Sequence, residues 1–161
     1  MATLIADVPL NMTDLNFYRV TSGYVDSNFY PDANETIYGR DYADVLEVEW
    51  KQKGSYLLSV FGGYGLTTDG SGNVTGGTVT GYLETYWNGS DWVAGWGIED
   101  ASVSATSLYA AFKTSSTADD YAIIKQILSG DDSITGSTGK DVLIGYGGDD
   151  LMAPSKVTRF I

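Results

Sequence analysis

Hydrophobic and polar residues alternate with a period of two across residues 44–100. In the first segment Leu46, Val48 and Trp50 alternate with charged neighbours, and three later segments repeat the alternation with many β-branched and aromatic side chains. This period and composition are typical of antiparallel strands. Clusters of Gly, Asn and Asp separate the segments and predict a β-meander, with turns at residues 53–54, 69–73 and 88–91.

The same alternation predicts which side chains form the core. Trp92 and Trp96 stand in one register with Ile98, so we expect both tryptophans to be buried. Tyr82 and Tyr86 lie on the polar face of their strand, so we expect both to be exposed. The predicted core comprises Leu46, Val48, Trp50, Tyr56, Leu58, Val60, Trp92, Trp96 and Ile98.

Outside the meander, the pattern predicts further strands before residue 44 and two short helices after residue 101. The early strands are expected over residues 16–25 and 35–38. Ser104 and Thr117 are suited to cap the N-termini of the two helices. Together these elements predict a mainly β chain, an antiparallel β-sheet or sandwich domain closed by a short helical pair.

Length and composition narrow the class of protein. The chain has 161 residues, of which 43% are hydrophobic, and this suits one domain with a real core. Cys and His are both absent, which excludes disulfides, zinc–thiolate sites and a Ser-His-Asp triad. No apolar run approaches the roughly 18 residues that a membrane-spanning helix needs.

The charge of the chain limits its partners. Twenty-one acidic residues against nine basic ones give a net charge of -12, and the basic residues form no cluster. Nucleic acid and anionic membrane surfaces require clustered positive charge, so neither is predicted. The surplus of aspartate suits Ca²⁺, which prefers oxygen ligands, although an acidic surface also serves solubility alone.

A nine-residue repeat occupies residues 130–153, which read GDDSITGSTGKDVLIGYGGDDLMA. Asp132, Asp141 and Asp150 are nine residues apart, each with a glycine two positions before it and an apolar residue two positions after it. Glycines permit tight turns that expose carbonyl oxygens, and the apolar side chains point inward. Two nonapeptides then complete one coil, and stacked turns surround Ca²⁺ with oxygen atoms.

Residues 130–153 resemble RTX (hemolysin-type calcium-binding) repeats of secreted toxins, proteases, lipases and surface-layer proteins of Gram-negative bacteria. The preceding stretch, from about residue 56, resembles a β-rich module often placed ahead of such repeats. The resemblance implies Ca²⁺ as cofactor, a truncated C-terminal parallel β-roll stub, and an extracellular, secreted or surface-associated location. Four residues depart from the family pattern by replacing glycines: Ile127, Leu128, Ser137 and Tyr146.

The β-roll geometry predicts where calcium binds. Positions 18 residues apart stack on one edge, so Asp132 and Asp150 are expected to form a site together with carbonyl oxygens such as those of Gly130 and Gly148. Two carboxylates and a few carbonyls make a weak site, with an expected dissociation constant of about 10⁻⁴–10⁻³ M.

Asp141 is expected on the opposite edge of the β-roll. Its stacking positions there would be Ile123 and Arg159, neither of which is a Ca²⁺ ligand. We therefore expect Asp141 to bind Ca²⁺ only weakly or through a neighbouring subunit.

Catalysis is not predicted. Paired carboxylates can support glycoside hydrolysis, and the available pairs are Glu47 with Glu49 and Glu99 with Asp100. The first pair shares the polar face of a strand, which is the ordinary solvent-facing arrangement. The sequence contains no P-loop, nucleophile elbow or metal-hydrolase motif.

Two non-enzymatic functions remain. We favour an extracellular calcium-binding structural or assembly module of a surface, matrix or virion, acting as a homo-oligomer, because a solitary coil leaves a strand edge that a neighbouring chain can complete. The alternative is a calcium-dependent carbohydrate-binding or adhesion module in which exposed aromatic side chains stack on sugar rings. Its candidate residues are Tyr82, Tyr86 and Trp87.

The pattern divides the chain into four segments. They are an antiparallel β domain (1–103), the helical pair (104–129), the repeat stub (130–153) and a tail (154–161). Residues 1–10 lack the basic and apolar regions of a Sec-type signal peptide, and the tail leaves little room for a type I secretion signal.

Overall fold

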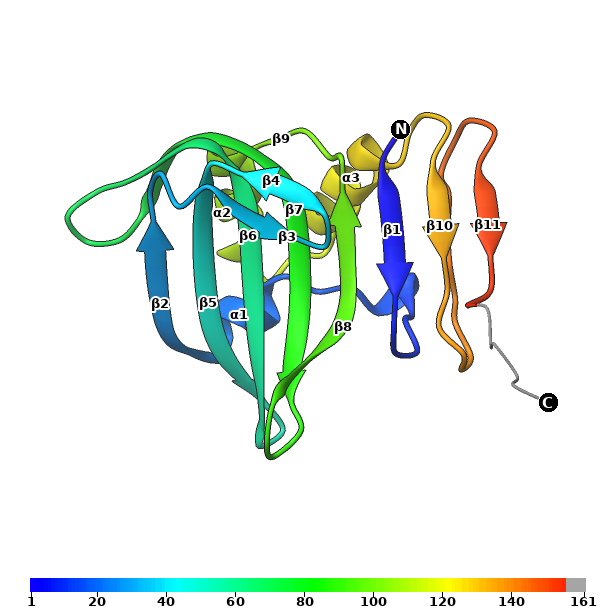
Figure 1. Cartoon of the computed structure of the whole chain (residues 1–161), viewed down its shortest axis with the longest axis horizontal. Helices are drawn as coiled ribbons and strands as arrows, with labels where there is room; N and C mark the ends of the chain where they lie inside the picture. Colours follow the sequence, from blue (N-terminus) through cyan, green and yellow to red (C-terminus); the bar gives the residue numbers. More distant parts are fainter. Residues whose placement is uncertain (156–161) are drawn as a thin grey trace.

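The computed structural model describes residues 1–155, which form one nine-stranded mixed sheet and three α-helices (Figure 1). In sheet order the strands are β11 (Leu151–Ala153), β10 (Ser133–Thr135), β1 (Thr3–Ala6), β8 (Trp92–Glu99), β7 (Val74–Trp87), β6 (Ser55–Thr68), β5 (Asp44–Gln52) and β2 (Tyr24–Tyr30), and β9 (Val103–Ser104) pairs with β7.

The helices cover one face of this sheet, which we term the back face (Figure 1). They are α1 (Tyr18–Ser22), α2 (Ala105–Phe112) and α3 (Ala118–Ile127), with a 3-10 turn, η1 (Met12–Asp14), ahead of them. A hairpin of β3 (Glu35–Ile37) and β4 (Arg40–Tyr42) crosses the opposite, front face (Figure 1). Within residues 1–155, no helix combines the length and apolarity needed to cross a membrane.

The predicted mainly β class and the meander are confirmed, and the sandwich is not. Strands β5 to β8 follow one another as antiparallel neighbours. Helices, rather than a second large sheet, cover the back face. Strand β1 extends the meander through antiparallel pairing with β8 and joins it to β10 through parallel pairing. One sheet therefore runs through both the predicted β domain and the repeat segment, and the segment boundaries stay a prediction.

Seven of the nine predicted core residues are buried or pack against a hydrophobic cluster, but they divide between both faces of the sheet. Trp50 belongs to the main core against the helices, whereas Val60 belongs to a smaller front-face cluster under the β3–β4 hairpin. Trp96 is buried with 6% of its surface exposed, but Trp92 is 39% exposed. Tyr56, also predicted in the core, is 37% exposed on the front face.

A β-bulge explains the error at the tryptophans. Thr85 pairs with Ala94, whereas the preceding Glu84 pairs with Trp96, so one extra residue, Gly95, stands in β8. An inserted residue reverses the side on which all following side chains point. Trp92 and Trp96 therefore lie on opposite faces.

The strand predicted over residues 16–25 is replaced by α1 followed by β2. Phe17 and Val20 both pack into the core at helical spacing. The Phe17 N–H donates to Asp120 Oδ2 at 2.9 Å, which satisfies a backbone donor that no strand partner serves. The later prediction of β-structure near residues 35–38 is confirmed by β3.

The predicted helical pair is confirmed as α2 and α3. Ser104 caps α2 by accepting a hydrogen bond from the Ser107 N–H. Thr117 precedes α3 but makes no side-chain capping bond. Ile124 and Leu128 are almost fully buried, so the apolar stripe of α3 packs against the sheet.

A row of polar side chains crosses the core on the back face. Trp50 Nε1 donates to Ser59 Oγ at 3.1 Å, Ser59 bonds the Tyr82 hydroxyl at 3.0 Å, and that hydroxyl donates to Glu84 Oε2 at 3.2 Å. The Tyr82 ring centroid lies 5.0 Å from those of both Phe61 and Trp96. The expectation that Tyr82 is exposed is therefore wrong.

The Glu84 carboxyl should make stability depend on pH. Burial raises its pKa, although hydrogen bonds from Tyr82 and Trp96 oppose the shift. Between the unfolded and the raised folded pKa, the folded state binds more protons, so the free energy of unfolding increases as pH falls through that window. Glu84→Gln should reduce this increase in urea denaturation between pH 7 and about pH 4.5.

A matched control for this prediction is Glu49→Gln on the front face of β5. Burial also raises the pKa of Asp120, so part of the pH dependence should remain in Glu84→Gln. An unchanged pH profile in Glu84→Gln would show that the Glu84 carboxyl does not titrate differently in the folded protein.

Candidate metal centre

The repeat segment forms two parallel layers, and the N-terminal segment adds a third. Ile134 in β10 pairs with Met152 in β11, 18 residues later. On the other side of β10, Leu4 in β1 pairs in parallel with Ile134. The next stretch of the N-terminal segment continues the stacking, since Asn11 pairs in parallel with Val142. The sequence did not predict this third layer, because residues 2–12 carry none of the repeat's glycines.

Each repeated aspartate binds the backbone of the layer before it. Asp150 Oδ1 accepts from the Asp132 N–H at 3.0 Å, and Asp132 Oδ1 accepts from the Ala2 N–H at 2.6 Å. On the opposite edge, Asp141 Oδ1 accepts from the Leu10 N–H at 2.8 Å. These carboxylates hold successive layers together, because a charged acceptor makes a stronger hydrogen bond to an N–H group than a neutral one.

The predicted stacking neighbours of Asp141 are therefore wrong in part. Leu10, not Ile123, lies against Asp141, because the N-terminal segment occupies the preceding layer. The Ser137 hydroxyl also donates to the Asp141 carboxylate, at 3.0 Å. The other predicted neighbour, Arg159, lies outside the described residues.

In the second and third nonapeptides, the first glycine makes room for the aspartate of its own turn. A Cβ atom added at Gly145 would collide with the Asp150 carboxylate, and one added at Gly136 would lie 2.7 Å from Asp141 Oδ2. The carboxylates thus fold back over their own turns. This close approach explains why glycine stands five positions before Asp141 and Asp150.

One edge of the stack concentrates negative charge. Asp131 and Asp132 precede β10, Asp149 and Asp150 precede β11, and Asp149 N–H donates to Asp131 Oδ1 at 2.9 Å. The two turns touch, since a Cβ atom at Gly148 would collide with the Gly130 carbonyl. None of the ion pairs found within residues 1–155 involves these four aspartates.

The donor set fits a hard cation only in part. Asp132 is 3% exposed, and its Oδ2 atom is buried without a hydrogen-bond partner in the structure. An unpaired buried carboxylate oxygen is costly, and a cation would satisfy it. However, no group of three acidic side chains in the described part of the chain is arranged to hold a metal. Calcium here would need backbone carbonyls beside one or two carboxylates.

Residues 128–154 match the family of the RTX calcium-binding nonapeptide repeat (4 copies). The chain carries RTX repeats. RTX nonapeptide repeats bind calcium, are in general not enzymatic, and belong to proteins that are typically secreted or extracellular. Neither the curated proteins nor the solved structures give a match to this chain.

The two acidic pairs considered for catalysis have structural contacts. Arg40 bonds Asp100 at 2.8 Å and lies 3.9 Å from Glu99, which ties the β3–β4 hairpin to the end of β8. Glu47 accepts from the Tyr30 hydroxyl at 3.4 Å, and burial raises the pKa of Glu47.

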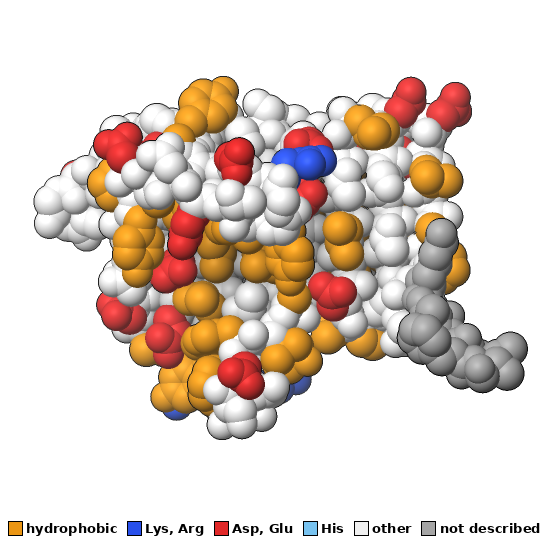
Figure 2. Space-filling view, in the orientation of Figure 1, with side chains coloured by type: hydrophobic (Ala, Val, Ile, Leu, Met, Phe, Trp, Pro, Cys, Tyr) orange, Lys and Arg blue, Asp and Glu red, His pale blue; other side chains and the backbone are white. Residues whose placement is uncertain are grey.

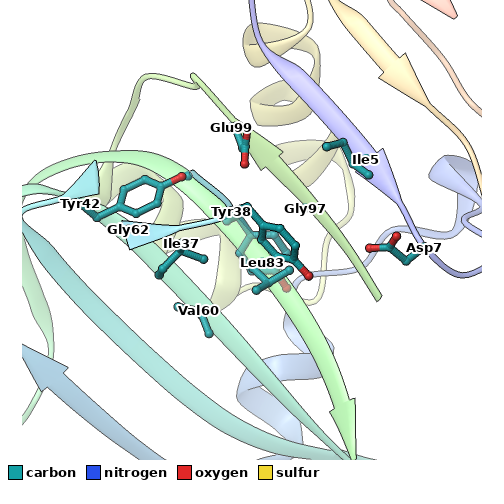
Figure 3. Close-up of a pocket in the computed structure, with 12 residues that line it drawn as sticks. Ile5, Asp7, Ile37, Tyr38, Tyr42, Val60, Gly62, Leu83, Gly97 and Glu99 are labelled. Carbon is teal, nitrogen blue, oxygen red and sulfur yellow. The ribbon is translucent and has the colours of Figure 1, made fainter. Parts of the chain in front are cut away.

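A small pocket lies under the β3–β4 hairpin, beside Tyr38, Leu83 and Glu99 (Figure 3). Its volume is about 40 Å³, room for only a few water molecules. Tyr42 fills the neighbouring space, because its ring packs where Cβ atoms at Gly62 and Gly81 would stand. The pocket is therefore a by-product of docking the hairpin on the sheet.

The aromatic residues proposed to stack on sugars divide between the two faces. Tyr82 is in the back-face core, and Tyr86 is half-buried. Trp87 is 40% exposed and its ring centroid lies 5.4 Å from that of Trp92 in an edge-to-face arrangement. Hydrophobic side chains gather on the front face below the hairpin, which agrees with this exposure (Figure 2).

Proposed function

We propose that the protein is a non-enzymatic extracellular module in which the repeat segment forms a short β-roll that binds Ca²⁺. The proposed ligands are Asp132 and Asp150, with carbonyl oxygens of Gly130 and Gly148. The observation that carries this proposal is the buried, unpartnered Oδ2 atom of Asp132 at an edge where four aspartates stack. A divalent cation there would offset both the unpaired oxygen and the mutual repulsion of the carboxylates.

Asp141 has a different role in this proposal. It stands alone on the opposite edge, where the Leu10 N–H and the Ser137 hydroxyl already occupy its carboxylate. A single occupied carboxylate is a poor Ca²⁺ site. We therefore assign Asp141 to holding the N-terminal layer, with at most weak Ca²⁺ binding.

A role in assembly is supported by the exposed end of the sheet. Within residues 1–155, β11 is the last strand and pairs only with β10. Leu151 and Met152 in this strand are 68% and 47% exposed. An exposed strand edge with apolar side chains is suited to pairing with another chain. A second copy of this chain is the proposed partner, as in a surface, matrix or virion lattice.

Calcium titration of the full chain tests the proposal. Calorimetry should give one saturable Ca²⁺ site with a dissociation constant of about 10⁻⁴–10⁻³ M, and Mg²⁺ should bind more weakly because two carboxylates and flexible carbonyls do not make a rigid octahedron. Native mass spectrometry with and without Ca²⁺ tests assembly. Absence of binding up to several millimolar Ca²⁺ would reject the site, and a monomer under all conditions would reject assembly.

Glycan binding is a second candidate, favoured by one feature of the front face. In the strand register Lys51 pairs with Tyr56, and Trp87 pairs with Trp92. Leu57 pairs with Tyr86, so Tyr56 on β6 stands next to Trp87 on β7. Three exposed aromatic rings thus form a row across β6, β7 and β8. Rings in such a row can stack against the C–H faces of a neutral sugar chain.

The double variant Trp87→Ala/Trp92→Ala tests this second candidate. If the row binds glycans, the variant should lose at least about tenfold in affinity for soluble cello- or chito-oligosaccharides, because each stacked ring contributes on the order of 1 kcal/mol. Tyr64→Ala, which removes an exposed ring elsewhere on β6, is the matched control. Equal affinities of variant and wild type in calorimetry, or no binding by wild type, would reject glycan binding at this row.

A further inference from the structure

A cavity of about 330 Å³ lies between the back face of the sheet and helices α1 and α2. Its lining comes from β2, β5, β6, β7 and the two helices, and includes no residue of β1, β10 or β11. It is therefore separate from the repeat segment. Its apolar walls include Phe29, Leu46, Val48, Val74, Leu108 and Phe112.

The helices leave part of the back face unfilled at the β2–β5 end. Phe29, Leu46 and Val48 pack against the core but remain only partly buried. Protein interiors are normally close-packed, so an unfilled apolar volume of this size is unusual in a small domain. Apolar walls offer water few hydrogen-bond partners and can take up apolar molecules. The walls therefore favour an aliphatic or aromatic ligand.

On one side of the cavity the β6–β7 turn meets α2. The Tyr109 hydroxyl donates to Asn73 Oδ1 at 2.8 Å, and Lys113 Nζ reaches the same oxygen at 3.4 Å, so the turn is tethered to the helix. Among the described residues that line the cavity, Lys113 is the only charged one, and Thr68 and Ser71 add hydroxyl groups. On this side the lining therefore offers a ligand one positive charge and several hydroxyls.

We propose that this cavity binds a single-chain fatty acid of medium length, with its tail among the apolar walls and its carboxylate at Lys113. A volume near the low end of the roughly 300–1,000 Å³ typical of ligand pockets suits such a chain. The positive charge selects a carboxylate over a neutral head group. Lys113 is exposed to solvent, which screens its charge, so the tail supplies most of the affinity.

Chain length is the first test, by calorimetry of the full chain with sodium octanoate, decanoate and dodecanoate below their micelle concentrations and without added Ca²⁺. Each additional buried methylene should raise the affinity about fourfold, until the tail fills the cavity. No saturable binding of dodecanoate would overturn the proposal.

Two variants locate the ligand. Val48→Phe adds a ring to the cavity wall and should weaken both decanoate and decanol at least tenfold. Lys113→Met should weaken decanoate about three- to fivefold, as expected for a partly exposed charge pair, and leave decanol unchanged. Lys125→Met, which removes the same charge from the exposed side of α3, is the control and should match wild type.

The binding results for these variants decide where the ligand lies and which group holds its carboxylate. A folded Val48→Phe with wild-type affinity would place the ligand outside the cavity, and Leu108→Phe on α2 gives the same test if Val48→Phe fails to fold. Decanoate binding that does not change in Lys113→Met would overturn the carboxylate assignment. Asp132→Asn should bind decanoate as wild type does, which separates this site from calcium binding.

Discussion

Asp132→Asn should abolish the stabilisation that Ca²⁺ gives to the folded protein. A ligand at about 100 times its dissociation constant adds about 2.7 kcal/mol to the free energy of unfolding of wild type. Asparagine keeps an oxygen that can accept from the Ala2 N–H but removes the charge that the cation needs. Urea denaturation in excess CaCl₂ and in EDTA measures the difference, with MgCl₂ as the control cation.

The two other repeat aspartates make this prediction specific. Asp150→Asn should lose the same Ca²⁺-dependent stabilisation, because Asp150 stacks directly on Asp132. Asp141→Asn should keep it, because Asp141 lies on the opposite edge and bonds Leu10. If Asp141→Asn is the damaging change and Asp132→Asn is neutral, the ligands have been assigned to the wrong edge.

The meander could be predicted from the sequence because a strand's partners there are its neighbours in the chain. The division of its side chains between two faces could not. Gly95 is an extra residue in β8, and nothing in the alternation of Trp92, Trp96 and Ile98 reveals it. The sequence also predicted a strand where α1 forms. The Phe17 N–H at the start of this helix bonds the Asp120 carboxylate, and a partner about a hundred residues away leaves no local pattern in the sequence.

The candidate site was predictable to a similar extent. The nonapeptide spacing identifies the aspartates and the 18-residue stacking, because both follow from local turn geometry. The layer contributed by residues 2–12 leaves no such pattern. Its contacts are hydrogen bonds from the Ala2 and Leu10 backbone, which every residue except proline can donate. Only the apolar pair Leu4 and Met12, both fully buried, hints at an inward-facing position.

Leu4→Ala should destabilise the protein by about 2–5 kcal/mol, the range measured for truncating a buried leucine. Leu4 is 0% exposed and pairs with Ile98 on one side and Ile134 on the other. In the described chain, β1 is the strand that joins β10 and β11 to the meander. Loosening it should therefore affect the repeat layers most, and urea denaturation measures the total loss.

Hydrogen exchange distinguishes a local effect from a general one. In Leu4→Ala, amide protection should fall further in β10 than in β6 and β7, whose pairing does not involve β1. Ile5→Ala is the matched control, because Ile5 is the next residue of β1, points to the front face and is 38% exposed, so its truncation should cost less. If both variants lose equal stability, or if protection in Leu4→Ala falls evenly across the sheet, β1 is not the element that holds the calcium-binding repeats to the rest of the fold.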